Sequence, residues 1–310
     1  MAKKDGVGVW DINSKTWTIE GLRGVKGIRC VAWRPWGGKM LAVGSEAGII
    51  LWVLENGKVI WLKEWGFHGV RGLDWSPDGR MLIGRSGEEG NGKIVLWDVG
   101  RRDATVLGKG CGEVSWSPDC GRYLFMGGEK GSFKIWDVMR GKTEKFKSLG
   151  KVKAAAWSRD GTMVAVGCRN EEAIHVLRLN SGKGSAELAR VVYTEPTGVP
   201  EVGAGGDALV MAWDRYGERL AVGFAKEKTQ DDEYAEGNLV GLYATSAAPY
   251  FNASPIGYIR GPSGSGRAVS LKFHPRPNSA KGAILAIAWA GGCISFVQMA
   301  FLPQHRADGF

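Results

Sequence analysis

Cysteine and histidine are scarce in this 310-residue sequence, which has five cysteines and four histidines. No two cysteines form a Cys-x-x-Cys pair, and no histidine lies at metal-ligand spacing from another histidine or from a cysteine. The odd number of scattered thiols argues against a disulfide framework and favours a reducing compartment. We therefore predict neither a metal site nor any other cofactor.

Motifs of catalysis and nucleotide binding are missing as well. No Gly-x-Ser-x-Gly leads from a strand into a helix, and no pair of acidic residues stands apart from the turn aspartates. Residues 87–93 loosely match a phosphate-binding loop, but Ile94 replaces the required Ser or Thr, and a strand is expected to follow instead of a helix. We expect a protein that is not an enzyme and has no small-molecule substrate.

Basic runs are absent although the net charge is +9, because no stretch of Lys or Arg exceeds two residues. A soluble basic surface explains this charge better than a nucleic-acid site does, so a nucleic-acid partner is not favoured. Residues 283–303 form a long uncharged run, and at 21 residues it would be long enough to span a bilayer. Gly291 and Gly292 interrupt it, so we interpret it as part of a β pattern.

Tryptophan and glycine, by contrast, are abundant, with 14 and 48 copies. Residues 114–138 read as three short strands separated by turn signals at 117–121 and 127–131. No helix fits this stretch. Most of the rest of the chain consists of variants of this module.

The module recurs along the chain, and the first strand of each copy ends in an aromatic residue. The intervals between these residues are 42, 41, 41, 56 and 60, and the residues are Trp33, Trp75, Trp116, Trp157, Trp213 and Phe273. A period of about 40–45 residues with four strands per unit is typical of a WD40-type propeller blade. Inserted loops explain the two longer intervals. We predict an all-β fold, a seven-bladed WD40-type β-propeller, with these six side chains in the blade cores.

The domain boundaries follow from the repeat. Six copies are complete, and residues 6–19 add half a blade, in which Trp10-Asp11 matches Trp97-Asp98 of a third strand. We expect the missing strands of that half blade upstream of Met1 or from the C-terminus. Residues 1–303 are assigned to one propeller domain and residues 304–310 to a polar C-terminal tail.

The first and second strands of the blades are joined by turns of the general form Ser-Pro-Asp-Gly. Four basic residues follow these turns and would form either a positive ring on one face or four separate solvated charges: Lys39, Arg80, Arg122 and Arg219. Trp36 stands at a turn tip where other blades have Asp. It is the candidate aromatic anchor for a partner, with packing against the blade edge as the alternative.

His68 lies shortly before a first strand, where many WD40 blades carry a histidine that hydrogen bonds along the blade. The Asp that should accept this bond in the second hairpin is absent, for example from Ser-Glu-Ala-Gly at 45–48. We expect the usual hydrogen-bonded tetrad to be mostly lost, so that packing of Trp and aliphatic side chains contributes more of the stability.

Several stretches resemble one particular family. They are Val-Met-Ala-Trp-Asp at 210–214, Gly-Tyr-Ile-Arg-Gly at 257–261, Phe-His-Pro at 273–275 and Val-Ala-Trp-Arg-Pro at 31–35. Over about residues 5–303 the chain resembles the aladin family of WD-repeat nucleoporins. The resemblance implies a scaffold at the nuclear pore complex of the nuclear envelope, with other nucleoporins as partners, especially a transmembrane nucleoporin. It also implies a role in protein and mRNA transport, only indirect contact with the membrane, and no catalytic residues.

The function expected from the residues and the resemblance is therefore that of a non-enzymatic interaction platform. The alternative is an RNA-binding or general adaptor propeller that uses the basic residues as a rim. The two differ in their response to salt, because binding through several phosphates weakens steeply with ionic strength.

Overall fold

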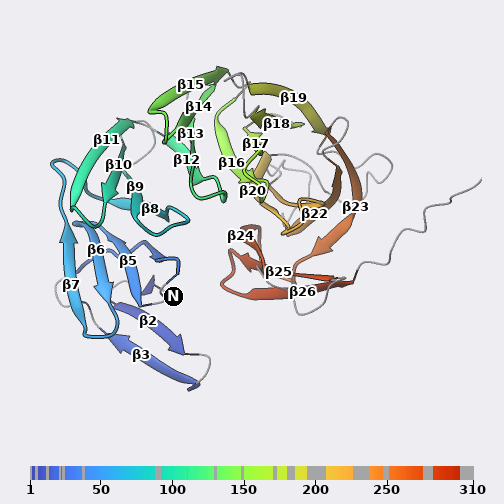
Figure 1. The fold of residues 1–310 in the computed structure, drawn as a ribbon. Helices are drawn as coiled ribbons and strands as arrows, with labels where there is room; N and C mark the ends of the chain where they lie inside the picture. The colour runs from blue at the N-terminus through green and yellow to red at the C-terminus, as the bar shows by residue number, and fades with distance from the viewer. Residues whose placement is uncertain are drawn as a thin grey trace, which may run out of the picture. The chain divides into compact units, whose positions relative to one another are not determined.

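The structure, a computed structural model, is built from β-strands joined by turns (Figure 1). It describes residues 2–3, 6–11, 14–20, 22, 25–36, 39–87, 92–109, 111–128, 131–147, 150–169, 173–179, 186–193, 207–225, 238–246, 251–274 and 282–300. The chain forms two compact units, Met1–Phe146 and Lys147–Phe310.

The first unit holds four antiparallel sheets, ordered β1-β2-β3, β4-β5-β6-β7, β8-β9-β10-β11 and β12-β13-β14-β15. The strands are β1 (Ala2–Lys3), β2 (Gly6–Asp11), β3 (Thr16–Glu20), β4 (Cys30–Trp33), β5 (Met40–Ser45), β6 (Gly48–Val53), β7 (Lys58–Leu62), β8 (Val70–Trp75), β9 (Met81–Ser86), β10 (Lys93–Asp98), β11 (Asp103–Lys109), β12 (Cys111–Trp116), β13 (Tyr123–Gly128), β14 (Ser132–Asp137) and β15 (Lys142–Lys147).

The second unit holds three antiparallel sheets, ordered β16-β17-β18-β19, β20-β21-β22-β23 and β24-β25-β26. The strands are β16 (Val152–Trp157), β17 (Met163–Cys168), β18 (Ala173–Leu179), β19 (Ala186–Tyr193), β20 (Asp207–Trp213), β21 (Arg219–Ala225), β22 (Leu239–Ser246), β23 (Asn252–Arg260), β24 (Ala268–Phe273), β25 (Gly282–Trp289) and β26 (Ile294–Ala300).

The middle strands of each sheet are apolar because both of their faces are covered. Every residue of β17 is buried, and so are five of the six in β5 and in β6. The fourth strand lies at the outside, and in β15 five of six residues are exposed. This gradient explains why the middle strands β5, β6 and β17 read as nearly continuous hydrophobic runs, whereas the outer strand β15 carries charge.

Neighbouring sheets of the first unit pack face to face. One core cluster joins Val7 of β2 to Leu41 and Val43 of β5 and to Ile50 and Trp52 of β6. The opposite face of β5 and β6 belongs to a second cluster, which includes side chains of β8 and β10. Since a single sheet cannot bury both of its faces, each blade depends on its neighbours for its core.

The predicted all-β fold is confirmed, and the seven sheets match the seven predicted repeats in chain order. The uncharged run at 283–303 includes the paired strands β25 and β26, as the β interpretation of that run predicted. The half blade has one strand more than predicted, because Ala2 pairs with Val7. The last copy, predicted to be complete, has three strands among the described residues. The predicted tail at 304–310 lies outside the described residues.

Candidate interaction surfaces

The turns between first and second strands are stabilised by their own side chains. In the turn at 76–79, the Ser76 hydroxyl donates to Asp78 Oδ1 at 2.6 Å, and the same oxygen accepts the Arg80 N–H at 3.0 Å. Gly79 has a φ of 69°. The turn at 158–161 repeats the hydroxyl-to-carboxylate bond at 2.6 Å. The turn chemistry predicted from Ser, Asp and Gly is confirmed.

The turn after β12 differs because Cys120 is inserted between Asp119 and Gly121. Cys120 and Gly121 both have positive φ values, 61° and 72°. Asp119 Oδ1 is buried without a hydrogen bond in the described structure, whereas Ser117 Oγ still accepts the Tyr123 N–H at 2.9 Å. The insertion thus removes the aspartate cap and keeps the serine cap.

Two of the three basic residues predicted to line the turn face of the first unit are paired with carboxylates. Lys39 forms an ion pair with Glu55, and an Arg122 guanidinium nitrogen lies 3.6 Å from Asp137 Oδ2. Arg80 is exposed, and no carboxylate partner is found for it in the described part of the chain. Most of the predicted positive charge on this face is therefore already balanced.

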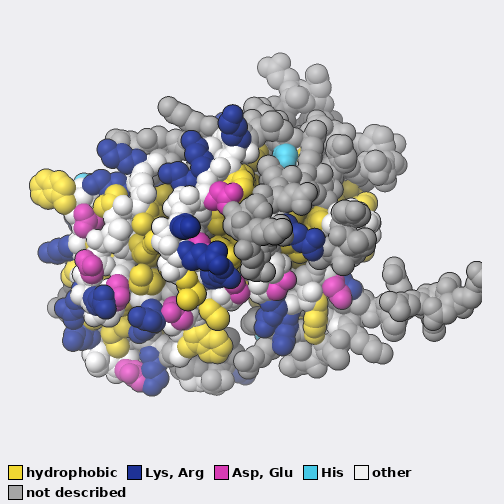
Figure 2. Space-filling model, turned by 45° about the horizontal axis from the view of Figure 1, so that its top comes forward, with side chains coloured by type: hydrophobic (Ala, Val, Ile, Leu, Met, Phe, Trp, Pro, Cys, Tyr) yellow, Lys and Arg dark blue, Asp and Glu magenta, His cyan; other side chains and the backbone are white. Residues whose placement is uncertain are grey.

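In the second unit, Arg219 is also paired. Its Nη1 lies 3.4 Å from Asp214 Oδ2 and 3.1 Å from Glu218 Oε2. Over the face seen in Figure 2, Lys and Arg side chains are interspersed with Asp and Glu. Because Lys39, Arg122 and Arg219 are each paired with a carboxylate, they do not form a ring of unpaired positive charge.

Trp36 combines high exposure with a constrained position. Its side chain is 85% exposed, its φ is 61°, and its indole N–H donates to the Pro77 carbonyl oxygen in the next blade at 2.6 Å. A bulky residue rarely adopts positive φ, so the contact with Pro77 helps to hold a strained conformation. The N–H is thus tied to the neighbouring turn while the ring faces solvent, and the role of Trp36 as a partner anchor stays a prediction.

The predicted core aromatics are buried with one clear exception. Those below 10% exposure are Trp75, Trp116, Trp157 and Trp213, and Phe273 is partly buried. Trp33 is 47% exposed, so its predicted burial is wrong. Trp75 packs toward the preceding sheet, where its indole N–H donates to Ala32 O at 3.1 Å. Trp33 ends the first strand of its own blade in the same way. The preceding sheet, β1-β2-β3, has no described strand in the inner position that would cover the Trp33 side chain.

The hydrogen-bonded tetrad of typical blades is missing around His68, where the sequence predicts its loss. His68 is exposed, and the buried indole nitrogens of Trp52 and Trp97 have no hydrogen-bond partner in the described structure. Phe67 packs edge-to-face on Trp97, with ring centroids 4.9 Å apart. Aromatic packing therefore occupies the place of the hydrogen-bond network in this blade.

A groove of about 660 Å³ lies at the end of β7, a feature that sequence reasoning did not predict. Trp65 is 90% exposed and Trp61 is 39% exposed. The lining residues are Ala47, Trp61, Leu62, Lys63, Glu64, Trp65, Gly66, Phe67 and His68. This aromatic groove is called the Trp61–Trp65 groove below. The sequence signal for it is a pair of tryptophans near the end of an outer strand. In another outer strand, β15, lysines occupy most of the exposed positions.

The turn that carries Trp65 is fixed from three sides. Phe67 is buried and anchors it, and the Phe67 N–H donates to Glu64 O at 3.1 Å. Lys93 Nζ donates to Trp65 O at 2.7 Å, and Gly66 supplies a φ of 66°. Because the backbone on both sides of Trp65 is tied down, its exposed ring is presented on a preformed surface.

Two absences hold for the part of the chain that the structure describes. No group of three or more His, Cys, Asp or Glu side chains there could hold a metal ion. No helix there has the length and apolar character needed to cross a membrane.

Comparison with known proteins agrees with the fold. A family model, WD40: WD domain, G-beta repeat, matches residues 62–98. Two solved structures each match over 96% of this chain. One is a chain of a mitotic checkpoint complex, with a TM-score of 0.68 and 18% identity over 82% of that chain. The other is the β-propeller domain of Cps50 (Swd1) from Myceliophteria thermophila, with a TM-score of 0.67 and 16% identity over 90% of that chain. These likenesses establish the WD40-type β-propeller fold.

Sequence comparison adds relatives. Aladin from Arabidopsis thaliana is 27% identical over 301 residues, covering 86% of this chain and 64% of that protein. WD repeat and HMG-box DNA-binding protein 1 from Homo sapiens is 28% identical over 175 residues, covering 49% of this chain and 15% of that protein. The chain thus spans less than two thirds of the length of either relative. With its repeats, its fold and this similarity along most of its length, the chain is an aladin-like WD-repeat protein.

Proposed function

We propose that this protein is a scaffold nucleoporin, a non-enzymatic WD40 platform that docks at the nuclear pore complex through a transmembrane nucleoporin and supports nucleocytoplasmic transport. The observation that carries the proposal is the similarity to Arabidopsis aladin over 86% of the chain. Since the chain covers 64% of that relative, the localisation and the partners of the whole protein belong to the proposal as well.

The surface of the molecule is consistent with protein docking. Trp36 and Trp65 are both largely exposed. The Trp36 indole N–H donates to the Pro77 carbonyl oxygen, and the Trp65 carbonyl oxygen accepts a hydrogen bond from Lys93 Nζ. Rigid exposed aromatic residues are typical anchors of protein interfaces, because little conformational entropy is lost when they are covered.

The RNA-binding alternative has less support from the charges. Binding to phosphates needs several free cations, but Lys39, Arg122 and Arg219 each have a carboxylate neighbour. An RNA ligand would have to compete with these pairs. The charge pairs therefore support protein docking over RNA binding.

Affinity capture from detergent-solubilised nuclear envelopes tests the proposal. The tagged full chain is incubated at low and at high salt, with and without nuclease, and recovered proteins are identified by mass spectrometry with crosslinking. We expect a transmembrane nucleoporin to be recovered at both salt concentrations, and a fluorescent fusion to label the nuclear rim. Recovery of RNA-bound material that is lost with salt or nuclease, or a diffuse fusion, would overturn the proposal.

A further inference from the structure

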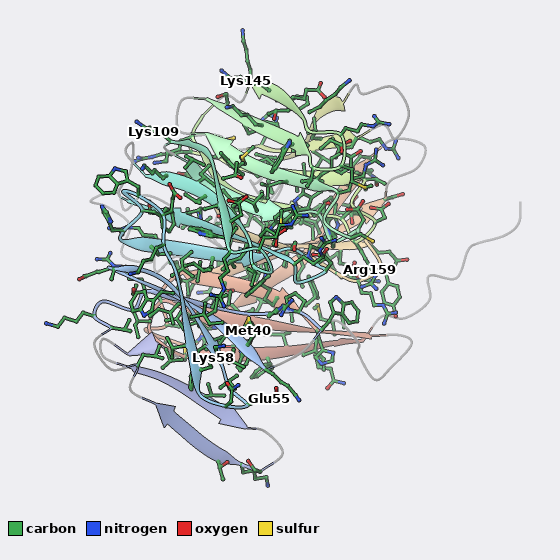
Figure 3. The ribbon with its side chains drawn as sticks, turned by 60° about the vertical axis from the view of Figure 1, so that its left-hand side comes forward. Met40, Glu55, Lys58, Lys109, Lys145 and Arg159 are labelled. Atoms are coloured by element: carbon green, nitrogen blue, oxygen red, sulfur yellow. The ribbon has the colours of Figure 1, made fainter. Side chains whose placement is uncertain are left out.

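The outer edge of β7 is poorly protected against pairing with another strand. β7 is the last strand of its sheet, so one side of its backbone has no strand partner among the described residues. The outer strand β15 carries three lysines, among them Lys145, and β11 ends in a single lysine, Lys109; both side chains are labelled in Figure 3. In β7 the single lysine, Lys58, is the first residue, and Val-Ile-Trp-Leu follows it. Natural sheets protect exposed edges with charge, above all lysine, so an apolar unprotected edge indicates a surface for strand addition.

Apolar side chains continue from this edge into the Trp61–Trp65 groove. Val59 is 42% exposed, and it shares one face of β7 with Trp61 because the two are separated by one residue. Val59 is opposite Trp52, and Trp61 is opposite Ile50, so the strand itself is firmly paired on its inner side. Trp65 then extends the apolar surface beyond the strand end. An added strand would therefore find side-chain contacts as well as backbone partners.

The charges at the two ends of this surface are positive. Lys58 and Lys63 are exposed, and neither has a carboxylate partner in the part of the chain that the structure describes. Glu55, which lies near Lys58 in Figure 3, is already paired with Lys39. Glu64 lines the groove and reduces the positive charge there without cancelling both lysines. Acidic residues on either side of an apolar strand would complement these ends.

We propose that the edge of β7 and the Trp61–Trp65 groove together bind an extended segment of a partner protein, in which a short apolar stretch is flanked by acidic residues. The segment adds a strand to β7, places an apolar side chain against Trp61 and Trp65, and sets its acidic flanks against Lys58 and Lys63. This interaction does not depend on the nuclear pore assignment, because every element of it lies within residues 47–68.

Selection from a displayed library of random peptides tests the proposal with the purified full chain as the target. Selected peptides are synthesised with a fluorescent label, and their affinities are measured by fluorescence anisotropy. We expect acid-flanked apolar sequences. Trp65→Ala should weaken their binding by about tenfold or more, as loss of an aromatic hot spot does. Lys58→Glu with Lys63→Glu should also weaken it, and more at low salt than at high salt.

Matched controls separate this surface from the rest of the molecule. Met139→Ala removes an exposed apolar side chain elsewhere in the first unit, and Lys142→Glu with Lys145→Glu reverses two charges on β15; both should leave the affinity unchanged. Peptides N-methylated at alternate residues provide the test of strand addition. One set should lose binding because its N–H groups face β7, and the other should keep it.

Three results would overturn the proposal. The first is a selection that enriches no peptide on the wild-type chain over the Trp65→Ala variant. The second is equal binding of acid-flanked and lysine-flanked versions. The third is displacement of the peptides by a short uridylate oligonucleotide that itself loses affinity with Trp65→Ala, which would assign the groove to nucleic acid. A failure in any of these leaves nuclear-envelope capture unaffected, so the two proposals are tested separately.

Discussion

The unpaired indole nitrogens lead to an unusual prediction about two buried tryptophans. Trp75 and Trp97 are both at or below 5% exposure, but the Trp75 N–H donates to Ala32 O at 3.1 Å, whereas the Trp97 N–H is buried without a partner in the described structure. Trp→Phe removes the same atoms at both sites. The loss of packing should therefore be similar, about 1–2 kcal/mol each.

The hydrogen bonds make the two substitutions differ. Trp75→Phe also loses the bond to Ala32, which adds about 1 kcal/mol to the destabilisation. Trp97→Phe instead removes a buried donor that has no acceptor, which returns about 1 kcal/mol or more. A phenyl ring at position 97 can keep the edge-to-face contact with Phe67. We expect Trp75→Phe to lower the free energy of unfolding by about 2–3 kcal/mol and Trp97→Phe by about 0–1 kcal/mol.

Urea unfolding followed by far-UV circular dichroism measures the difference. Because an array of blades can depart from two-state unfolding, the slope of the free energy with urea must be the same for both variants and the wild type. Hydrogen exchange of the backbone amides in β9 and β10 gives a second, local measurement. If Trp97→Phe destabilises the protein as much as Trp75→Phe does, the Trp97 N–H is satisfied in solution and the reasoning is refuted.

Three further predictions concern glycine packing and titration. Gly84→Ala should lower the free energy of unfolding by about 1–3 kcal/mol, because an added Cβ would lie within 3.0 Å of three side chains from other strands and loops; urea unfolding with an unchanged midpoint would contradict this. Burial raises the pKa of Cys30 to about 11, so its thiol should resist iodoacetamide under conditions in which exposed Cys120 reacts. Since the folded state holds this proton more tightly than the unfolded chain, stability should fall as the pH rises from 9.0 toward about 11, and Cys30→Ala should remove that part of the pH dependence. Burial alone would raise the pKa of Asp160, but hydrogen bonds, the largest from Ser158, hold this pKa below the ordinary 3.8. The resulting stabilisation is present above pH 3.8 and is lost on acidification. In thermal melts, the melting temperature of Asp160→Asn should therefore decline less steeply in acid than that of the wild type.

The features that the sequence predicts well are those whose causes lie within a few residues. A Ser-Pro-Asp-Gly turn contains its own hydroxyl donor, its own carboxylate acceptor and its own glycine, so the geometry at Ser76 and Asp78 follows from the local sequence. The repeat interval adds the order of the strands, because each copy must present the same apolar faces to its neighbours. The sheets of the fold could be predicted on these grounds.

The pairing of charges could not be predicted in the same way. Arg122 follows its turn as expected, but its carboxylate neighbour Asp137 comes from β14, and the partner of Lys39 comes from the hairpin between β6 and β7. For Lys39 and Arg122, the sequence places the basic residue beside the turn without placing the acid that faces it, whereas Arg219 pairs with acids of its own turn, Asp214 and Glu218. The turn pattern alone therefore could not decide between a positive ring and separate charges.

The Trp61–Trp65 groove depends on contacts that are distant in the sequence. Trp65 is exposed because Phe67 turns inward against Trp97, which belongs to the next copy, and because Lys93 holds the backbone of the turn. The repeat pattern assigns this segment to the end of one blade and the start of the next. The pattern alone does not show which of the aromatic residues there are buried.

Trp33 illustrates the limit of reasoning from a repeat. Each copy places an aromatic residue at the end of its first strand, but the residue is covered by the inner strand of the preceding sheet, as Trp75 is at Ala32. The covering group is therefore not part of the copy that contains the tryptophan. In the described residues the sheet before Trp33 runs only β1-β2-β3, and 47% of the side chain is left exposed. The same position in the repeat thus holds a buried residue in one blade and a half-exposed one in another, because burial in a repeat protein is a property of the interface between copies.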